Sequence, residues 1–80
     1  MPVKLKIISA SKILFEDNVD YCEIPGEYGT EGILPGHINF LSFINAGVIK
    51  YKKGEKENTI GIEAGFAEIN SDNVNVLIES

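Results

Sequence analysis

The sequence has no arginine, so its seven basic residues are all lysines, and they face 12 acidic residues for a formal net charge of -5. Domains that bind nucleic acid normally cluster basic side chains that displace counterions from phosphate. Here only Lys50, Lys52, Lys53 and Lys56 lie near one another, around an expected turn. Nucleic acid is therefore not an expected partner.

Cysteine and histidine occur once each. A single cysteine cannot form a disulfide within the chain, which excludes the disulfide framework of a small secreted protein. One Cys and one His also exclude the usual structural zinc sets. Cys22 alternates with Asp20 and Ile24, so we expect a small buried strand side chain rather than a nucleophile. No metal site and no cofactor are expected.

Long apolar runs are missing too. The first twelve residues, "MPVKLKIISASK", contain only two consecutive isoleucines. This is far short of a signal peptide or a spanning helix, so we expect no direct insertion into a membrane and a cytoplasmic compartment by default. A length of 80 residues with 44% hydrophobic residues predicts a single domain, residues 1–80, with a thin core.

Apolar and polar residues alternate along nearly the whole chain. In "KLKIIS", Leu5 and Ile7 alternate with Lys4 and Lys6, as on a strand with one buried face. Similar runs cover residues 12–17, 19–24, 37–44, 47–53, 58–63, 65–69 and 74–78. Gly, Pro or Asn separates most of them, and no window shows helical spacing. The pattern predicts an all-β fold, a small β-sandwich or flattened barrel of seven or more antiparallel strands.

One hairpin is especially clear, with its turn at "KGEK", residues 53–56. Ile49 and Tyr51 share a face of the first strand, and Ile60 and Ile62 belong to the return strand. A lysine at a hairpin tip is also where biotinyl and lipoyl carriers take their cofactor. Lys53 lacks the flanking methionines or preceding aspartate of those carriers, so a solvated edge lysine is favoured and the carrier remains a minor alternative.

The segment "IPGEYGTEGILPGHINFLSF", residues 24–43, concentrates glycine and proline and contains His37. A phosphate-binding loop would lead into a helix and commonly carry Lys before Ser or Thr, and Glu27 and Glu31 would repel phosphate. For catalysis His37 would need an orienting group and a nucleophile, and no elbow motif or carboxylate pair supplies them. We therefore expect a turn-rich connector and no enzymatic activity.

Within this segment, "GILPGH" at residues 32–37 is the most specific motif. Together with Gly47-Val48, Gly65-Phe66 and Asn73-Val74 it resembles the N-terminal domain of the ε subunit of F-type ATP synthase, the chain called δ in mitochondria. The likeness covers nearly all 80 residues in order. Two positions depart from the family pattern: Glu31 precedes "GILPGH", and Ala64 replaces the first glycine of Gly-Gly-Phe.

The resemblance implies a flattened antiparallel β-sandwich of about ten short strands. The helical pair that follows this domain in the family has no counterpart in the sequence, either because the chain was cut or because the subunit is a short form. The implied function is a non-catalytic subunit of the central stalk, or rotor, that links γ to the c-ring and couples proton translocation to ATP synthesis.

The resemblance further implies a peripheral location on the cytoplasmic face of the bacterial inner membrane and a monomer when the domain is isolated. A β-sandwich that binds a small molecule is the alternative left open.

Position by position, the resemblance also implies contact residues. The expected contacts with the c-ring are Glu27, Tyr28, Gly29, Thr30 and Glu31. The expected contacts with γ are Ser9, Ala10, Ser11, His37, Ile38, Phe40 and Ser42. The bend between the two segments is expected at Gly32, Pro35 and Gly36. No catalytic, cofactor-binding or metal-binding residue is implied.

Overall fold

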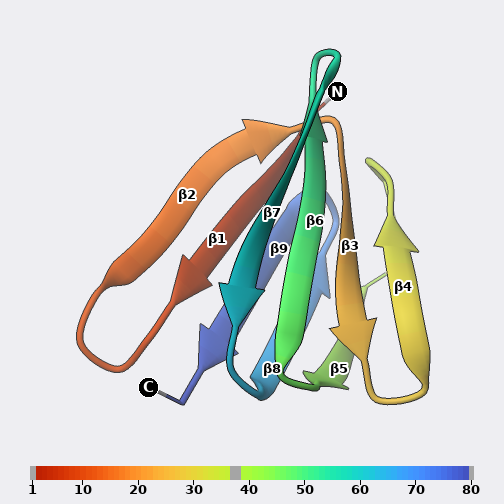
Figure 1. Ribbon diagram of the computed structural model, residues 1–80. Helices are drawn as coiled ribbons and strands as arrows, with labels where there is room; N and C mark the ends of the chain where they lie inside the picture. The colour runs from red at the N-terminus through yellow and green to blue at the C-terminus, as the bar shows by residue number, and fades with distance from the viewer. Residues whose placement is uncertain (1, 37–38, 80) are drawn as a thin grey trace.

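The computed structural model describes residues 2–36 and 39–79, which form strands joined by turns (Figure 1). The strands are β1 Val3–Ile8, β2 Ile13–Val19, β3 Tyr21–Gly26, β4 Gly29–Ile33, β5 Phe40–Ile44, β6 Gly47–Lys53, β7 Lys56–Ile62, β8 Gly65–Asn70 and β9 Asn73–Ile78. No helix in these residues is long and apolar enough to cross a membrane. The predicted all-β fold is confirmed, with nine described strands where the resemblance implied about ten.

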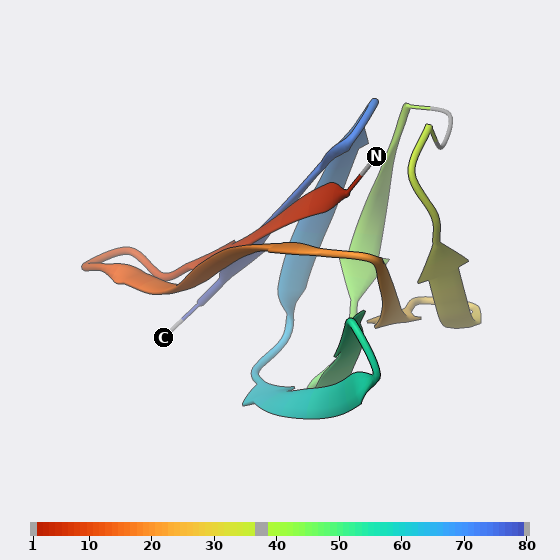
Figure 2. The same cartoon turned by 90° about the horizontal axis from the view of Figure 1, so that it is seen from above.

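The strands form one curled sheet in the order β2-β1-β9-β8-β5-β3-β6-β7, with β4 paired to β3. β5 and β3 share a single residue pair, Gly26 with Ile44, and the backbone N–H of Asn45 donates to the carbonyl of Pro25 at 2.8 Å beside it. The sheet folds over at this narrow junction. As Figure 2 shows, the strands on its two sides form two layers, and the β1–β2 hairpin projects beyond them.

The first and last strands, β1 and β9, lie side by side and run parallel. Every other described pairing is antiparallel, so this pair is the one departure from the predicted antiparallel sheets. A parallel pair cannot be closed by a short turn, and here it joins strands from opposite ends of the chain. β1 thereby completes the layer that β9, β8 and β5 begin.

Apolar side chains from both layers fill the space between them. The first and last strands, β1 and β9, contribute Val3, Leu5, Ile7, Val74, Val76 and Ile78. Strands β3, β4, β6 and β7 contribute Cys22, Ile24, Ile33, Ile49 and Ile62. No polar side chain among the described residues is buried. Alternation along β1 and β9 therefore gave the correct buried face, Leu5 and Ile7 included.

Two further predictions are confirmed. Cys22 is fully buried in β3, and burial in apolar surroundings raises the pKa of its thiol to about 12, which keeps it protonated and unreactive. The β6–β7 hairpin pairs Ile49 with Ile60, and its two-residue turn has Gly54 at a φ of 64°, a left-handed conformation that suits glycine.

The glycine-rich segment needs a correction, because part of it is a strand. Residues 29–33, expected to be loop and bend, form β4 and pair with β3, so the turn is confined to Glu27 and Tyr28. Gly32 lies opposite Glu23 within this ladder. A side chain at Gly32 would meet the phenol of Tyr21, so this glycine makes room for packing instead of turning the chain.

Candidate protein-docking surface

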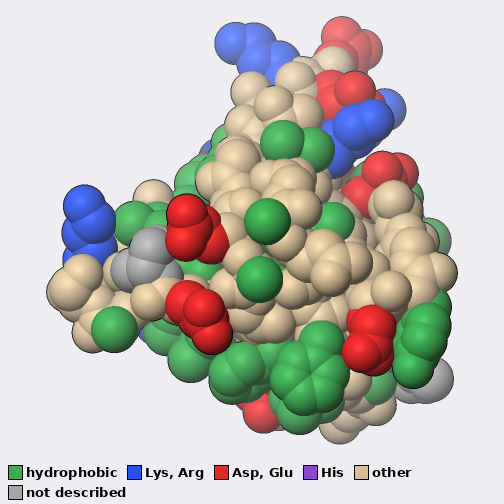
Figure 3. Space-filling model, turned by 60° about the horizontal axis from the view of Figure 1, so that its bottom comes forward, with side chains coloured by type: hydrophobic (Ala, Val, Ile, Leu, Met, Phe, Trp, Pro, Cys, Tyr) green, Lys and Arg blue, Asp and Glu red, His purple; other side chains and the backbone are tan. Residues whose placement is uncertain are grey.

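Successive strands along the chain run in opposite directions, so the odd-numbered strands all end at one end of the molecule (Figure 1). The turns after β1, β3, β5 and β7 gather there with the end of β9. We call this the lower end. Figure 3 looks toward it and shows hydrophobic side chains gathered with acidic ones among them. The turns after the even-numbered strands lie at the opposite end.

Three large apolar side chains form a row across the outer face of the β9-β8-β5 layer, near the lower end. Phe43 on β5 pairs with Phe66 on β8, which pairs with Leu77 on β9. Their exposed fractions are 67%, 37% and 37%. We call these three residues the apolar row. Aromatic and aliphatic pairs across neighbouring strands hold each other in place, so the row is presented on a rigid support.

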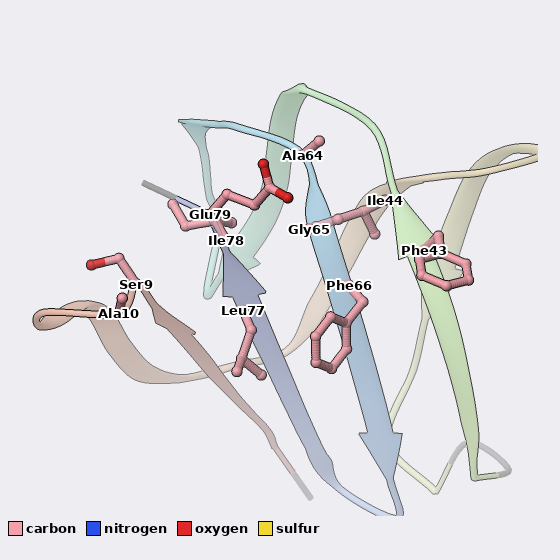
Figure 4. A pocket seen from close by; sticks show the side chains of 10 residues that line it. All are labelled: Ser9, Ala10, Phe43, Ile44, Ala64, Gly65, Phe66, Leu77, Ile78 and Glu79. Carbon is pink, nitrogen blue, oxygen red and sulfur yellow. The ribbon is translucent and has the colours of Figure 1, made fainter.

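The apolar row forms the floor of an open groove of about 550 Å³. Figure 4 shows Phe66 and Leu77 next to each other on adjacent strands, with Phe43 beyond them and Ser9 and Ala10 across the groove. The polar side chains along it are Ser9 and Glu79, and the Oγ atoms of Ser9 and Ser11 already lie 3.4 Å apart within hydrogen-bonding range. The groove is therefore an apolar surface with few groups able to orient a polar ligand.

Gly65 keeps the groove floor in register. It pairs with Ile78, and a β-carbon at this position would collide with the backbone of Leu77 and Ile78. Backbone atoms cannot move aside as the end of a flexible side chain can. Only glycine lets β8 approach β9 this closely beside Phe66 and Leu77.

The residues predicted to meet the c-ring belong to the β3–β4 hairpin. Tyr28 at its tip is 95% exposed, and Glu27 beside it is also exposed. Gly29 and Thr30 begin β4 and are exposed, whereas Glu31 is half-buried. The hydroxyl of Ser42 donates to Glu31 Oε1 at 3.1 Å, so the Glu31 carboxylate points toward β5.

The residues predicted to meet γ are not brought together at one place. Ser9, Ala10 and Ser11 form the β1–β2 turn at the lower end. Phe40 packs against the core and Ser42 bonds Glu31, although both belong to β5. His37 and Ile38 lie outside the described residues. Pro35 and Gly36 do lie in a turn, with Gly36 at a φ of 77°, as expected of a bend.

The sequence analysis missed the apolar row. In "FLSFI" every position except Ser42 is apolar, so the alternation did not show that Leu41 and Phe43, not Phe40, are exposed. A usable signal was present in β8 and β9. Phe66 shares its face with Glu68, and Leu77 shares its face with Asn75, so each is a large apolar residue on the polar side of its strand.

No group of three or more His, Cys, Asp or Glu residues within residues 2–36 and 39–79 is placed to hold a metal ion.

Two titratable side chains have a shifted pKa because each is paired with a neighbouring charged side chain. The hydroxyl of Tyr21 donates to Glu23 Oε2 at 2.7 Å, which raises the pKa of the phenol. Lys53 Nζ lies 2.6 Å from Asp17 Oδ2, which lowers the pKa of that carboxyl group.

Residues 2–80 match the family model for the β-sandwich domain of the ATP synthase delta/epsilon chain. The chain belongs to this family. It is 43% identical over 76 residues to the ATP synthase epsilon chain of Nitratidesulfovibrio vulgaris, covering 95% of this chain and 57% of that protein. It is 35% identical over 77 residues to the ATP synthase epsilon chain of Leptospira interrogans, covering 96% of this chain and 61% of that protein. The chain thus spans about three fifths of these relatives.

Solved structures agree with this family in fold. A chain of the mitochondrial ATP synthase of Euglena gracilis, from a structure that includes the c-ring, superposes with a TM-score of 0.89 at 21% identity over 99% of this chain and 51% of that one. A chain from the central stalk and c-ring of the Tetrahymena thermophila enzyme gives a TM-score of 0.79 at 8% identity, over 100% of this chain and 65% of that one. The family's β-sandwich is thereby established for this sequence.

Proposed function

We propose that this domain is a non-catalytic part of the central stalk of an F-type ATP synthase, where it links γ to the c-ring and couples proton translocation to ATP synthesis. Family membership and likeness to chains from ATP synthase structures support this role. Through these partners the domain would be held peripherally on the cytoplasmic face of a bacterial inner membrane.

The apolar row is the observation that carries the proposal. Three large apolar side chains exposed together on a rigid sheet mark a surface that another protein covers. Apolar and aromatic groups at the centre of an interface provide most of its binding energy, and the polar groups around them exclude water. We assign this face to γ, with Ser9 and Ala10 at its margin.

The β3–β4 hairpin is assigned to the c-ring. Its tip exposes Tyr28 almost completely and places Glu27 beside it, so both an apolar ring and a negative charge are available to a partner. The hairpin and the apolar row both lie toward the lower end but on opposite sides of the fold junction, since β4 pairs with β3 on one side and β5, β8 and β9 form the other. A domain with two such surfaces can join two partners at once.

A small-molecule site in the groove is the competing function. Binding sites of that kind combine an apolar cavity with several converging polar groups that orient the ligand. Ser9 and Glu79 are the polar side chains along this groove, and the Ser9 hydroxyl has a neighbour in Ser11. Protein docking therefore fits the groove better than small-molecule binding does.

A matched pair of charge substitutions tests the γ assignment. Phe43→Glu places a carboxylate in the apolar row, whereas Val48→Glu makes a comparable change at an apolar residue of β6 that is 54% exposed and does not line the groove. We expect Phe43→Glu to weaken binding to purified ATP synthase γ subunit by about tenfold or more, as the loss of a central aromatic contact does. Calorimetry or biolayer interferometry would measure the affinity of each variant for the γ subunit.

Val48→Glu should bind γ as the unaltered chain does. Equal affinity for both variants would show that γ docks elsewhere, and no binding by the unaltered chain would contradict the proposed function itself.

A further inference from the structure

Two hydrogen bonds tie the connector between β4 and β5 to the turn between β8 and β9. The backbone N–H of Gly36 donates to Asp72 Oδ1 at 2.7 Å, and the backbone N–H of Ser71 donates to Asn39 Oδ1 at 2.7 Å. Each segment thus supplies one side-chain acceptor and one backbone donor to the other. We call this reciprocal pair of bonds the latch.

The latch joins segments that are 36 and 32 residues apart in the sequence. Its two donors are both in left-handed backbone conformations, with φ of 77° at Gly36 and 57° at Ser71. Ser71 is the one non-glycine residue of the described chain with a positive φ. A non-glycine residue keeps a left-handed conformation only where the surrounding structure stabilises it. The hydrogen bond from the Ser71 N–H to Asn39 Oδ1 is one such stabilising contact.

The turn that holds the connector is itself fixed to the sheet. The backbone N–H of Lys4 donates to the carbonyl of Asp72 at 2.7 Å, which joins the β8–β9 turn to β1. Gly36 and Asn39 are thereby attached, through the β8–β9 turn, to three strands of one layer, β1, β8 and β9. Asn39 immediately precedes β5, the strand that carries Leu41 and Phe43, and Phe40 pairs with Ile69 on β8. The latch therefore fixes the point at which the docking strand enters its layer.

We propose that Asp72 and Asn39 are positioning residues for γ docking, and this rests on the proposed function. They hold Gly36, Asn39 and the start of β5, the strand that carries Phe43, in the bound geometry before γ arrives. Binding then costs less ordering of the chain, because the competent conformation is already the populated one. Neither residue has to contact γ for this effect.

Pairs of variants separate positioning from charge and from general stability. Asp72→Asn removes the charge but keeps the Oδ1 acceptor, whereas Asp72→Ala removes both. Asn39→Asp and Asn39→Ala form the same contrast at the other bond. Asp72 is only half-buried and Asn39 is exposed, so the alanine variants leave no cavity in the core.

Amide hydrogen exchange on the isolated domain tests the latch without γ. We expect Asp72→Ala to speed exchange at Gly36 by about tenfold and Asn39→Ala to do the same at Ser71, because each loses its acceptor. Core amides, such as that of Ile49 in β6, should keep their protection. The Asn and Asp variants should exchange as the unaltered chain does. Unchanged exchange in the alanine variants would overturn the latch.

Association kinetics with purified ATP synthase γ subunit test the positioning role. If a smaller fraction of molecules is competent, the association rate of the alanine variants should fall about threefold to tenfold while the dissociation rate changes little. Asp72→Asn should restore the association rate. Faster exchange with an unchanged association rate would overturn the positioning role but leave the proposed function intact. Failure of the unaltered chain to bind γ would overturn both.

Discussion

Gly65 illustrates how a single missing side chain shapes the groove. It begins β8 opposite Ile78 of β9, and the three nearest atoms that a β-carbon there would meet all belong to the backbone of Leu77 and Ile78. Gly61, on β7, is also a strand glycine, but a β-carbon built there meets nothing within 4 Å. Two glycines in equivalent secondary structure therefore have different physical roles, and the sequence alone does not separate them.

We predict that Gly65→Ala destabilises the domain by about 2 kcal/mol or more, because the added methyl group forces β8 and β9 apart. Gly61→Ala should be neutral or stabilising by up to about 1 kcal/mol, since alanine restricts the unfolded chain and meets no obstacle in the folded one. Urea denaturation of both variants measures the difference. Similar midpoints for the two would show that the β8–β9 approach is not tight.

At the scale of elements, β2 is joined to the β6–β7 hairpin by a small set of contacts. Lys53 Nζ lies 2.6 Å from Asp17 Oδ2, the N–H of Gly54 donates to Asp20 Oδ2 at 2.8 Å, and the N–H of Asp20 donates to the carbonyl of Lys52 at 2.8 Å. The rings of Phe15 on β2 and Tyr51 on β6 also pack together, at a centroid distance of 4.9 Å. These contacts join β2, at one end of the curled sheet, to β6, the strand next to its other end, with which β2 shares no strand pairing.

The Asp17 carboxyl group reports on this contact through its pKa. Its pKa is lowered from the ordinary value of 3.8, first by the hydrogen bond from Lys53 and then by the bond from the backbone N–H of Asn18. A lowered pKa in the folded state contributes stability above the unfolded pKa, and that contribution is lost as the pH falls through the folded pKa. The attachment of β2 to the hairpin should therefore weaken below about pH 4.

We predict that Lys53→Gln raises the pKa of Asp17 toward its ordinary value without restoring it fully, because the bond from Asn18 remains. Carboxyl-carbon NMR titration would measure the shift. Lys50→Gln is the matched control, since Lys50 pairs with Glu57 at 3.9 Å and not with Asp17. An Asp17 pKa that responds equally to both changes would mean that general charge, not the specific bond, sets it.

At the scale of the whole molecule, β9 is the central connection of its layer. It pairs with β1 on one side and β8 on the other, and it buries Val74, Val76 and Ile78. Burial of three such side chains contributes about 5 to 8 kcal/mol. This approaches the entire net stability of a small domain, about 5 to 15 kcal/mol. The last strand in the sequence therefore supports the first.

We predict that a chain ending at Asp72 is unfolded, because β1 and β2 lose the strand that attaches them to β8. A chain ending at Ile78 should stay folded, since the bond it loses is the long one from the N–H of Glu79 to the carbonyl of Ala64, at 3.3 Å. Circular dichroism and thermal denaturation would distinguish the two. A folded chain without β9 would contradict the central position assigned to that strand.

Several features of the fold could be predicted because they depend on local pattern. Leu5 and Ile7 alternate with lysines, Cys22 lies in an alternating run, and Gly54 has the turn chemistry of a hairpin, so each was placed correctly. β4 was missed because three of the residues in its neighbourhood are glycines at 26, 29 and 32, which normally indicate turns. Its strand conformation depends on pairing with β3, which local pattern does not show.

The sequence by itself determined that this chain folds from strands and not helices, because apolar and polar residues alternate with period two, and its motifs identified the family. Tertiary structure decided which apolar residues are left outside. Phe43, Phe66 and Leu77 are distant in sequence and become one surface only through the registers of β5, β8 and β9. The physical reason is that alternation fixes which residues share a face of one strand, whereas only pairing between strands decides which faces meet.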